Sequence, residues 1–567
     1  MSKGMRKGLT SYGDDAFSLF LRKAFVKAMG YSDDALSRPI VGIASTYSDY
    51  NACHGNVPQL VDAIKRGVML AGGLPMAFPT ISIHESFSHP TSMFLRNLMA
   101  IDTEEMVRAQ PMDAVVLIGG CDKTIPAQLM AAASANVPAI VVATGPMMTG
   151  QYQGERLGAC TDCRRFWAMY RANEIDDQTI DEVNSRLAPT TGTCMVMGTA
   201  STMACMTEAL GMMLPGGAAI PAVYAERLRH AEASGKRAVE MAAEDLTPSR
   251  IMTEGAFRNA FVTLQAIGGS TNGLVHMTAV ARRMGIEVDL DLFDELGRSV
   301  PVLVDLKPSG DHYMEHLYDA GGLNAVLREI RDQLDLDALT VSGAPLGENI
   351  ELGERVPDQT VIRSADDPIY PQGGMVVLRG NLAPRGAVLK ISAASDALIQ
   401  AEGRAVVFDS LEDLARRIDD PDLDVEASDV LVLRNAGPKG APGMPEAGYI
   451  PIPKKLAERG VKDMIRLSDA RMSGTAFGTI ILHVAPEAWV GGPLSVVQTG
   501  DRIRLDALER ALDLLVDEET LAARLDAWSP PPPHPGSERG YKKLYLDTVL
   551  QADEGCDFDF MLPAATD

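Results

Sequence analysis

The chain has 567 residues, of which 46% are hydrophobic and 23% are charged, and its formal net charge is −24. A chain of this length is too long for one compact core, so two or more domains are expected. The negative charge argues against nucleic acid as a partner. It also means that an anionic small-molecule substrate would have to be held by local cations, such as bound metal ions.

Neither a membrane segment nor a disulfide framework is expected. No stretch approaches the roughly 20 apolar residues of a membrane helix, and the N-terminus lacks the apolar core of a signal peptide. The default location is therefore the cytoplasm. Cysteines that are few, odd in number and scattered favour metal binding or catalysis in a reducing compartment. The seven cysteines are Cys53, Cys121, Cys160, Cys163, Cys194, Cys205 and Cys556.

The first part of the chain alternates helices with short apolar strands. This alternation predicts a parallel sheet with crossover connections. The strand over 114–118 is an unbroken apolar run, typical of a strand buried on both faces. The expected elements are a helix over 14–30, a strand over 39–45, a helix over 57–71, a strand over 79–83, a helix over 92–109, a strand over 114–118, a helix opened by Pro126 and a strand over 139–144.

Three of these strands are followed by loops that carry metal-ligand residue types. Cys53 follows the first strand, Glu85 follows the strand over 79–83, and Cys121, Asp122 and Lys123 follow the strand over 114–118. Ligands of open α/β sheets bind at the carboxyl ends of strands. Thiolates suit iron–sulfur clusters or zinc, whereas carboxylates suit magnesium. The pattern therefore indicates two different metals side by side, although buried core cysteine and surface ion pairs are the alternative interpretations.

Residues 160–290 are expected to be mostly helical, with two small-residue loops at 191–198 and 266–273. Either loop could present backbone N–H groups to an anion, but a tight helix-to-helix turn is the commoner meaning of such a pattern. Cys194 precedes a helix, which would stabilise a thiolate, and Cys205 falls inside that helix, as a core residue would. Cys160 and Cys163 form a C-x-x-C pair that reads as structural thiols, a redox pair or half a zinc site.

From Gly373 onward the pattern changes to β-type runs divided by glycine and proline. This predicts a β-rich barrel or sandwich with few helices. We therefore expect an α/β domain over 1–370 and a β-rich domain over 371–567. The tail begins as a polyproline spacer and continues as a short helix that packs on a neighbouring domain or subunit.

Six segments together resemble the dihydroxy-acid dehydratase and 6-phosphogluconate dehydratase family, and specifically its sugar-acid (aldonate) branch. The resemblance covers nearly the whole chain. It implies an N-terminal α/β domain, a swivel-like C-terminal barrel, and a homodimer or homotetramer. The segments are GGCDKTIPAQLMAAAS, TGTCMVMGTASTMA, AIGGSTNGLVH, GGMVVLRGNLAPRGAVLK, GPKGAPGMPE and SDARMSGTAFG.

The resemblance also assigns roles to individual residues. A [2Fe–2S] cluster, rather than [4Fe–4S], would be bound by three cysteines, leaving one iron open to a substrate oxygen. Mg²⁺ would be held by three carboxylates and by a carbamylated lysine. Ser473 would be the catalytic base, with Thr475 beside it, whereas Cys160 and Cys163 lie outside this ligand set. The implied ligands are Cys53, Cys121 and Cys194 for the cluster, and Glu85, Asp122, Lys123 and Glu446 for magnesium.

The implied reaction is dehydration of a 2,3-dihydroxy acid to a 2-keto-3-deoxy acid. Pentonates and hexonates are the substrates expected for the sugar-acid branch, and 2,3-dihydroxyisovalerate is the alternative. A non-catalytic or redox iron–sulfur protein is the rival class. It would have a fourth well-placed cysteine and no carboxylates for a hard cation, so Asp122, Glu85 and Glu446 argue against it.

Overall fold

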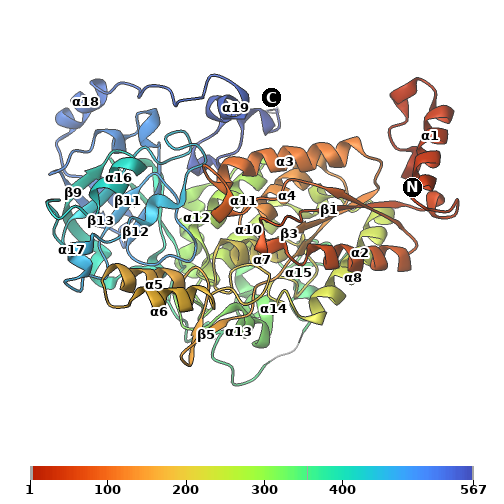
Figure 1. The fold of residues 1–567 in the computed structure, drawn as a ribbon, viewed down its shortest axis with the longest axis horizontal. Coiled ribbons are helices and arrows are strands. Elements are labelled where there is room, and N and C mark those ends of the chain that lie inside the picture. The colour runs from red at the N-terminus through yellow and green to blue at the C-terminus, as the bar shows by residue number, and fades with distance from the viewer. Residues whose placement is uncertain (1–3, 354–355, 565–567) are drawn as a thin grey trace.

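The computed structural model describes residues 4–353 and 356–564, which form an α/β part and a β-barrel part. In Figure 1 the barrel lies at the left and the α/β part at the centre and right. None of the helices formed by the described residues is both long enough and apolar enough to cross a bilayer.

The α/β part is organised around a parallel four-stranded sheet with the order β2-β1-β3-β4. The buried faces of these strands explain their apolar sequences. The strand expected over 79–83 is misplaced, because the chain pairs earlier: Leu74 aligns with Ile40 and the strand ends at Pro79. The strands are β1 (Ile40–Ser45), β2 (Leu74–Pro79), β3 (Ala114–Gly119) and β4 (Ala139–Ala143).

Helices cover both faces of this sheet, with α4 and α3 on one side and α2 and α8 on the other (Figure 1). Helices α2 and α8 cross closely at two glycines, since a Cβ on Gly67 would lie 1.9 Å from the Glu232 carbonyl oxygen. The helices here are α1 (Asp15–Ala28), α2 (Val57–Leu70), α3 (Ser92–Ala109), α4 (Thr124–Ala135) and α8 (Ala225–Glu244).

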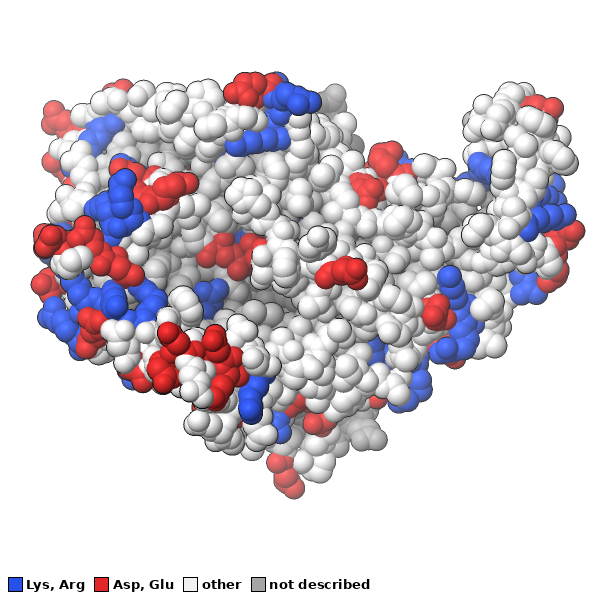
Figure 2. All heavy atoms as spheres, in the orientation of Figure 1, with Lys and Arg blue, Asp and Glu red and all other residues white. Residues whose placement is uncertain are grey.

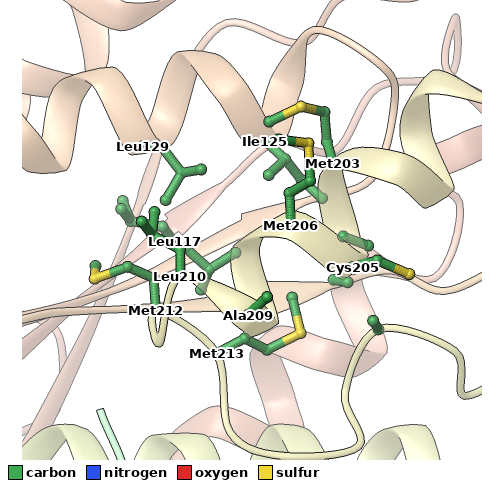
Figure 3. Close-up of a cluster of buried hydrophobic side chains, with 14 of the residues drawn as sticks. Leu117, Ile125, Leu129, Met203, Cys205, Met206, Ala209, Leu210, Met212 and Met213 are labelled. Carbon is green, nitrogen blue, oxygen red and sulfur yellow. The ribbon is translucent and has the colours of Figure 1, made fainter. Parts of the chain in front are cut away.

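Helix α7 packs against α4 and β3 to form the centre of the core. Figure 3 shows Leu117 of β3, Ile125 and Leu129 of α4, and the methionines of α7 gathered in one apolar cluster. The expected core position of Cys205 is confirmed, since its side chain is fully buried. The remaining helices of this part are α5 (Asp162–Arg171), α6 (Asp177–Asn184), α7 (Thr199–Ala209), α9 (Pro248–Ile251), α10 (Glu254–Ala266), α11 (Thr271–Arg283), α12 (Leu290–Ser299), α13 (Met314–Asp319), α14 (Gly322–Glu329) and α15 (Leu346–Asn349), with a hairpin of β5 (Gly150–Tyr152) and β6 (Glu155–Leu157).

The expected β-rich region is a closed eight-stranded barrel with the order β10-β11-β12-β8-β7-β14-β13-β9. Alternating aliphatic side chains fill its interior. Its strands are β7 (Val376–Gly380), β8 (Ala383–Leu389), β9 (Gln400–Phe408), β10 (Val430–Leu433), β11 (Arg466–Ser468), β12 (Ile480–Ala485), β13 (Arg502–Asp506) and β14 (Ala511–Leu514), and its helices are α16 (Leu411–Arg417), α17 (Lys454–Ala457) and α18 (Glu518–Asp526).

The C-terminal tail returns to the α/β part, as expected for a packing tail. Helix α19 (Gly540–Thr548) lies against α3, where the Tyr541 hydroxyl donates to the Phe94 carbonyl at 2.7 Å. Further along, the buried Arg283 of α11 pairs with Asp557 at 2.7 Å. The tail therefore joins the two parts of the molecule.

Candidate active site

Glycine at the end of β3 brings the Cys121 and Cys53 loops together. A Cβ on Gly120 would lie 1.9 Å from Thr144 Oγ1 and 3.0 Å from the Cys53 carbonyl oxygen, so only glycine permits this approach. Cys53 lies on a short 3₁₀ turn after β1. The two cysteines are 6% and 5% exposed, which is more buried than polar loop residues are expected to be.

His54 and His84 surround this cysteine pair. The Cys121 backbone N–H donates to His54 Nε2 at 3.1 Å, and His54 Nδ1 donates to the Thr46 carbonyl at 2.8 Å. A ligand atom of His84 lies within 4.8 Å of the sulfurs of Cys53 and Cys121. Hydrogen bonding from Cys121 and contact with His84 lower the pKa of Cys53 to about 6 despite burial, so the pair favours a thiolate at Cys53.

Three carboxylates face one another beside the thiols. Oxygen atoms of Glu85, Asp122 and Glu446 lie within 4.8 Å of one another. Glu85 and Asp122 come from the α/β part, whereas Glu446 comes from the loop after β10, so the site lies between the two parts. Lys123, which is fully buried, contacts Asp122, and its Nζ is 3.8 Å from Glu85 Oε2.

Arg471 pairs with two of these three carboxylates. Its guanidinium donates to Glu85 at 3.0 Å and to Glu446 at 2.5 Å. Burial alone would raise the pKa of Glu85, but Arg471 and Lys123 outweigh burial and hold that pKa well below its usual range. For Glu446, burial prevails and the pKa is raised.

Ser473 is held by a tight loop of the barrel against two helix starts of the α/β part. Its Oγ is 2.8 Å from Thr475 Oγ1. The Asn272 side chain donates to the Met472 carbonyl at 2.9 Å, and a Cβ on Gly474 would lie 2.6 Å from Ser270 Oγ. The small-residue loop at 266–273 is thus the expected turn between α10 and α11, and it supports the serine loop.

Cys194 faces the same cavity from the loop before α7. Its sulfur is 3.0 Å from that of Cys160, the first residue of the C-x-x-C pair. For Cys160, contact with Cys163 lowers the pKa, but the hydrogen bond with Cys194 and burial prevail and raise it well above its usual value. None of the seven cysteines, all of which the structure describes, forms a disulfide.

Most of these groups line one cavity of about 470 Å³. On the face drawn in Figure 2, the surface is hollowed between the barrel and the centre of the molecule. The cavity brings together nearly every residue singled out from the sequence, except Lys123, which lies behind Asp122. The sequence-derived site residues lining it are Cys53, Glu85, Cys121, Asp122, Cys194, Glu446, Ser473 and Thr475, joined by Cys160 and Cys163.

Sequence reasoning assigned no role to Arg471, His54 or His84, although each contacts the site. The sequence signal that could have found them is their closeness to predicted site residues: Arg471 lies two residues before Ser473, His54 follows Cys53, and His84 precedes Glu85. Adjacency did not show that the Arg471 side chain turns toward two carboxylates, because that contact depends on the docking of the barrel.

The two neighbouring sets of donor atoms in the cavity, thiols and carboxylates, fit two kinds of metal. Three carboxylates whose oxygens converge suit a hard divalent cation. Two contacting thiols, with the Cys194 thiol on the same cavity, suit a soft metal or an iron–sulfur cluster. A hydroxyl group within the same cavity adds a candidate proton acceptor. The cavity therefore carries donor atoms for two kinds of metal together with a hydroxyl group.

Known proteins similar to this chain are dehydratases. Family models described as dihydroxy-acid/6-phosphogluconate dehydratase N-terminal and C-terminal match residues 38–349 and 360–556. L-arabonate dehydratase of Azospirillum brasilense is 48% identical over 97% of this chain and 96% of its own length. L-arabinonate dehydratase of Rhizobium leguminosarum bv. trifolii (strain WSM2304) is 46% identical, with 97% and 95% covered. Dihydroxy-acid dehydratase of Acetivibrio thermocellus is 39% identical, with 94% and 96% covered.

Both family models match in order and cover most of the chain, so the protein belongs to the dihydroxy-acid/6-phosphogluconate dehydratase family.

Proposed function

We propose that this protein is a hydro-lyase that converts 2,3-dihydroxy sugar acids, such as pentonates or hexonates, to 2-keto-3-deoxy acids. The observation that carries the proposal is the convergence of thiols, carboxylates and the Ser473 hydroxyl on one cavity. Its volume, about 470 Å³, accommodates a five- or six-carbon acid.

A [2Fe–2S] cluster and Mg²⁺ are the proposed cofactors. Cys53, Cys121 and Cys194 would hold the cluster, and Glu85, Asp122 and Glu446 the magnesium, with Lys123 contributing oxygens once carbamylated. When bound, the two groups supply Lewis acidity at the substrate carboxylate, the C2 oxygen and the departing hydroxyl. An ammonium could not coordinate a cation, which is why the carbamate is part of the proposal.

The chain's own residues would orient the substrate and move its proton. The Ser473 Oγ, after its own proton has been lost to solvent, takes the C2 proton, and the Thr475 hydroxyl, 2.8 Å away, hydrogen-bonds to that oxygen and orients it. The α/β part and the barrel part each contribute residues to the wall of the cavity. The C3 hydroxyl then departs as water with the proton held by Ser473, which leaves an enol that tautomerises to the keto acid.

Sugar acids are preferred over 2,3-dihydroxyisovalerate on two grounds. The relatives named for arabinonate are 46–48% identical to this chain, against 39% for the dihydroxy-acid dehydratase quoted above. The cavity wall also includes the polar side chains of Ser86, Thr199 and Arg164, next to the apolar Trp167, and these polar side chains can hydrogen-bond to the hydroxyl groups of a sugar acid.

The direct test is keto-acid formation from a panel of pentonates, hexonates and 2,3-dihydroxyisovalerate, using protein kept anaerobic and supplied with Mg²⁺. We expect the highest kcat/KM for a sugar acid. Turnover of 2,3-dihydroxyisovalerate alone would favour the alternative substrate, and no keto acid from any diol acid would contradict the dehydratase assignment.

The cofactor proposal has a separate test in iron content. Cys53→Ser, Cys121→Ser and Cys194→Ser should each deplete iron and abolish or weaken the visible absorbance of the purified protein. Cys205→Ser is the matched control, because that thiol is buried in α7 and does not line the cavity. Full iron in all three ligand variants would contradict the cluster assignment.

We also propose a homodimer or homotetramer in the cytoplasm, with small-molecule substrates and neither nucleic acid nor membrane as partners. Helix α1 supports self-association: it extends from the body in Figure 1, and Phe20 and Phe25 are 65% and 70% exposed on it. Light scattering of the purified protein tests this, and a monomer would contradict it.

A further inference from the structure

Cys160 and Cys163 line the cavity but have no role in the proposed reaction. The turn that carries them is firmly held. The buried Asp162 carboxylate accepts hydrogen bonds from the Gly158 backbone N–H at 2.7 Å and from the Tyr313 hydroxyl at 3.1 Å, and Lys307 pairs with it at 3.1 Å. Cys160 itself adopts a left-handed backbone with φ of 77°, a conformation that a non-glycine residue rarely adopts without a specific reason.

This conformation directs the Cys160 side chain at Cys194. The two sulfurs are 3.0 Å apart, about 1 Å more than a disulfide bond requires. Both side chains are partly exposed and line the cavity, so a small oxidant can reach them.

We propose that Cys160 and Cys194 form an oxidation site, at which a reversible disulfide protects Cys194 when it is free of metal. The inference rests on the proposed function only in treating Cys194 as a cluster ligand. Cys160 is then a protective partner and not a ligand.

Hydrogen peroxide is the proposed oxidant, and the steps balance. The Cys194 thiol takes one oxygen atom from peroxide to give a sulfenic acid and one water molecule. The Cys160 sulfur then attacks the Cys194 sulfur, breaking its S–O bond. The hydroxide released takes the Cys160 proton and leaves as a second water molecule. Two thiols have lost two electrons in total, and peroxide has gained them.

The consequence is that Cys194 is spared further oxidation. Without a nearby thiol, a sulfenic acid proceeds to sulfinic acid, which a dithiol cannot reduce. With Cys160 in contact, the oxidised cysteine is held as a disulfide that a dithiol returns to two thiols.

The test uses the full-length protein, made metal-free with a chelator and a dithiol and then treated with a small excess of hydrogen peroxide. Free thiols are alkylated, and digested peptides are mapped by mass spectrometry. We expect Cys160–Cys194 to be the main disulfide. It should be absent from Cys160→Ser and retained in Cys163→Ser, a matched control from the same turn. A Cys160–Cys163 or Cys53–Cys121 link with Cys194 alkylated would overturn the proposal.

The second readout is recovery of iron after peroxide, dithiol and reconstitution with iron and sulfide. Wild-type protein should regain most of its iron, whereas Cys160→Ser should regain about fivefold less and carry sulfinic acid at Cys194, because no disulfide intercepts the oxidation. Cys160→Ala provides a second variant, and far-ultraviolet circular dichroism checks that both are folded. Equal recovery in wild type and in both variants would overturn the proposal.

The two proposals fail in different ways. If untreated Cys194→Ser keeps full iron, Cys194 is not a ligand, but the peroxide mapping of wild type still decides whether the disulfide forms. If untreated Cys160→Ser loses its iron, Cys160 is a ligand and the protective assignment is wrong.

Discussion

Arg471 compensates the buried negative charge of the three clustered carboxylates. It is 2% exposed and lies between Glu85 and Glu446, so it balances charge that would otherwise be buried unpaired. The burial of an arginine at this point also explains why Glu85 stays ionised over the whole physiological pH range.

Ser473→Ala tests the proposed base. The change removes a partly exposed loop hydroxyl, so folding and iron content should be nearly unchanged. Turnover should fall by roughly 10²–10⁴-fold, as for other lost acid–base groups, and exchange of the substrate C2 hydrogen with solvent should disappear. Activity within about tenfold of wild type would assign the base to another group, with Thr475 the next to test.

Substitution of Lys123 tests whether this lysine is carbamylated. In protein supplied with ¹³C-bicarbonate and Mg²⁺, we expect a carbamate carbon resonance that is absent from Lys123→Arg, because arginine keeps the charge but has no primary amine to carbamylate. Activity should rise with bicarbonate in wild type only. A bare ammonium at full occupancy in a crystal with magnesium bound would rule the carbamate out.

At the scale of elements, the serine loop is positioned by close backbone contact with the starts of α7 and α11. A Cβ on Gly474 would lie 2.8 Å from the Thr199 backbone nitrogen, as well as against Ser270. The position of Ser473 therefore depends on glycine at 474 and on helices from the other part of the chain.

Gly474→Ala should displace this loop by a few tenths of an ångström or more and reduce turnover by roughly tenfold to a hundredfold. Iron content should be retained, because the atoms nearest a Cβ at position 474 belong to Ser270 and Thr199 and not to a proposed cluster ligand. Gly536→Ala in the exposed tail is the control: its φ of 72° makes alanine strained, but no atom lies within 4 Å. Equal kcat in both variants would show that the contact does not position Ser473.

Local patterns predicted the elements well where burial alone decides them. The apolar runs at β3 and in the barrel, and the Ala/Leu/Met helix α4, followed directly from composition. The strand near residue 80 was misplaced because register with β1 decides its limits, and register is not visible in one segment.

The residues of the site were likewise predicted only in part from local patterns. The Cys53 and Cys121 loops were predicted because ligands bind at the carboxyl ends of strands, whereas Glu446 and Ser473 were assigned through the family resemblance. The contacts of Arg471 with Glu85 and of Cys160 with Cys194 join residues 386 and 34 positions apart. Such contacts depend on tertiary packing, which no local pattern reports.

At the scale of the whole molecule, buried histidines make stability depend on pH. Burial lowers the pKa of His54 to about 4 and that of His483 to about 3. As the pH falls, the histidines of the unfolded chain, whose pKa is about 6.5, therefore bind protons before those of the folded protein do. The stability that the two neutral histidines contribute is fully present above the pKa of the unfolded state and is lost as the pH falls toward the pKa of the folded state.

Between pH 7 and pH 5, each of these two histidines should lower the free energy of unfolding by about 2 kcal/mol. Glu208 and Glu487, whose pKa burial raises to about 7, act in the opposite direction, so the contribution of one histidine is isolated by substitution. Urea midpoints at the two pH values measure the change. In His483→Asn, the loss of unfolding free energy between the two pH values should be smaller by the contribution of that one histidine. Asparagine is chosen because it tolerates the left-handed backbone at this position. His89→Asn, at an exposed position, is the control, and an equal pH dependence in wild type and His483→Asn would contradict the assignment.

The buried pair between Arg283 and Asp557 ties the stability of α11 to a segment far along the chain. The two residues are 274 positions apart, and their side chains pair at 2.7 Å, whereas the carboxylate that the α/β part itself supplies, Glu104, is 3.4 Å from the same guanidinium. Docking of the tail therefore adds the shorter of the two ion pairs to a cation that would be costly to bury without full compensation.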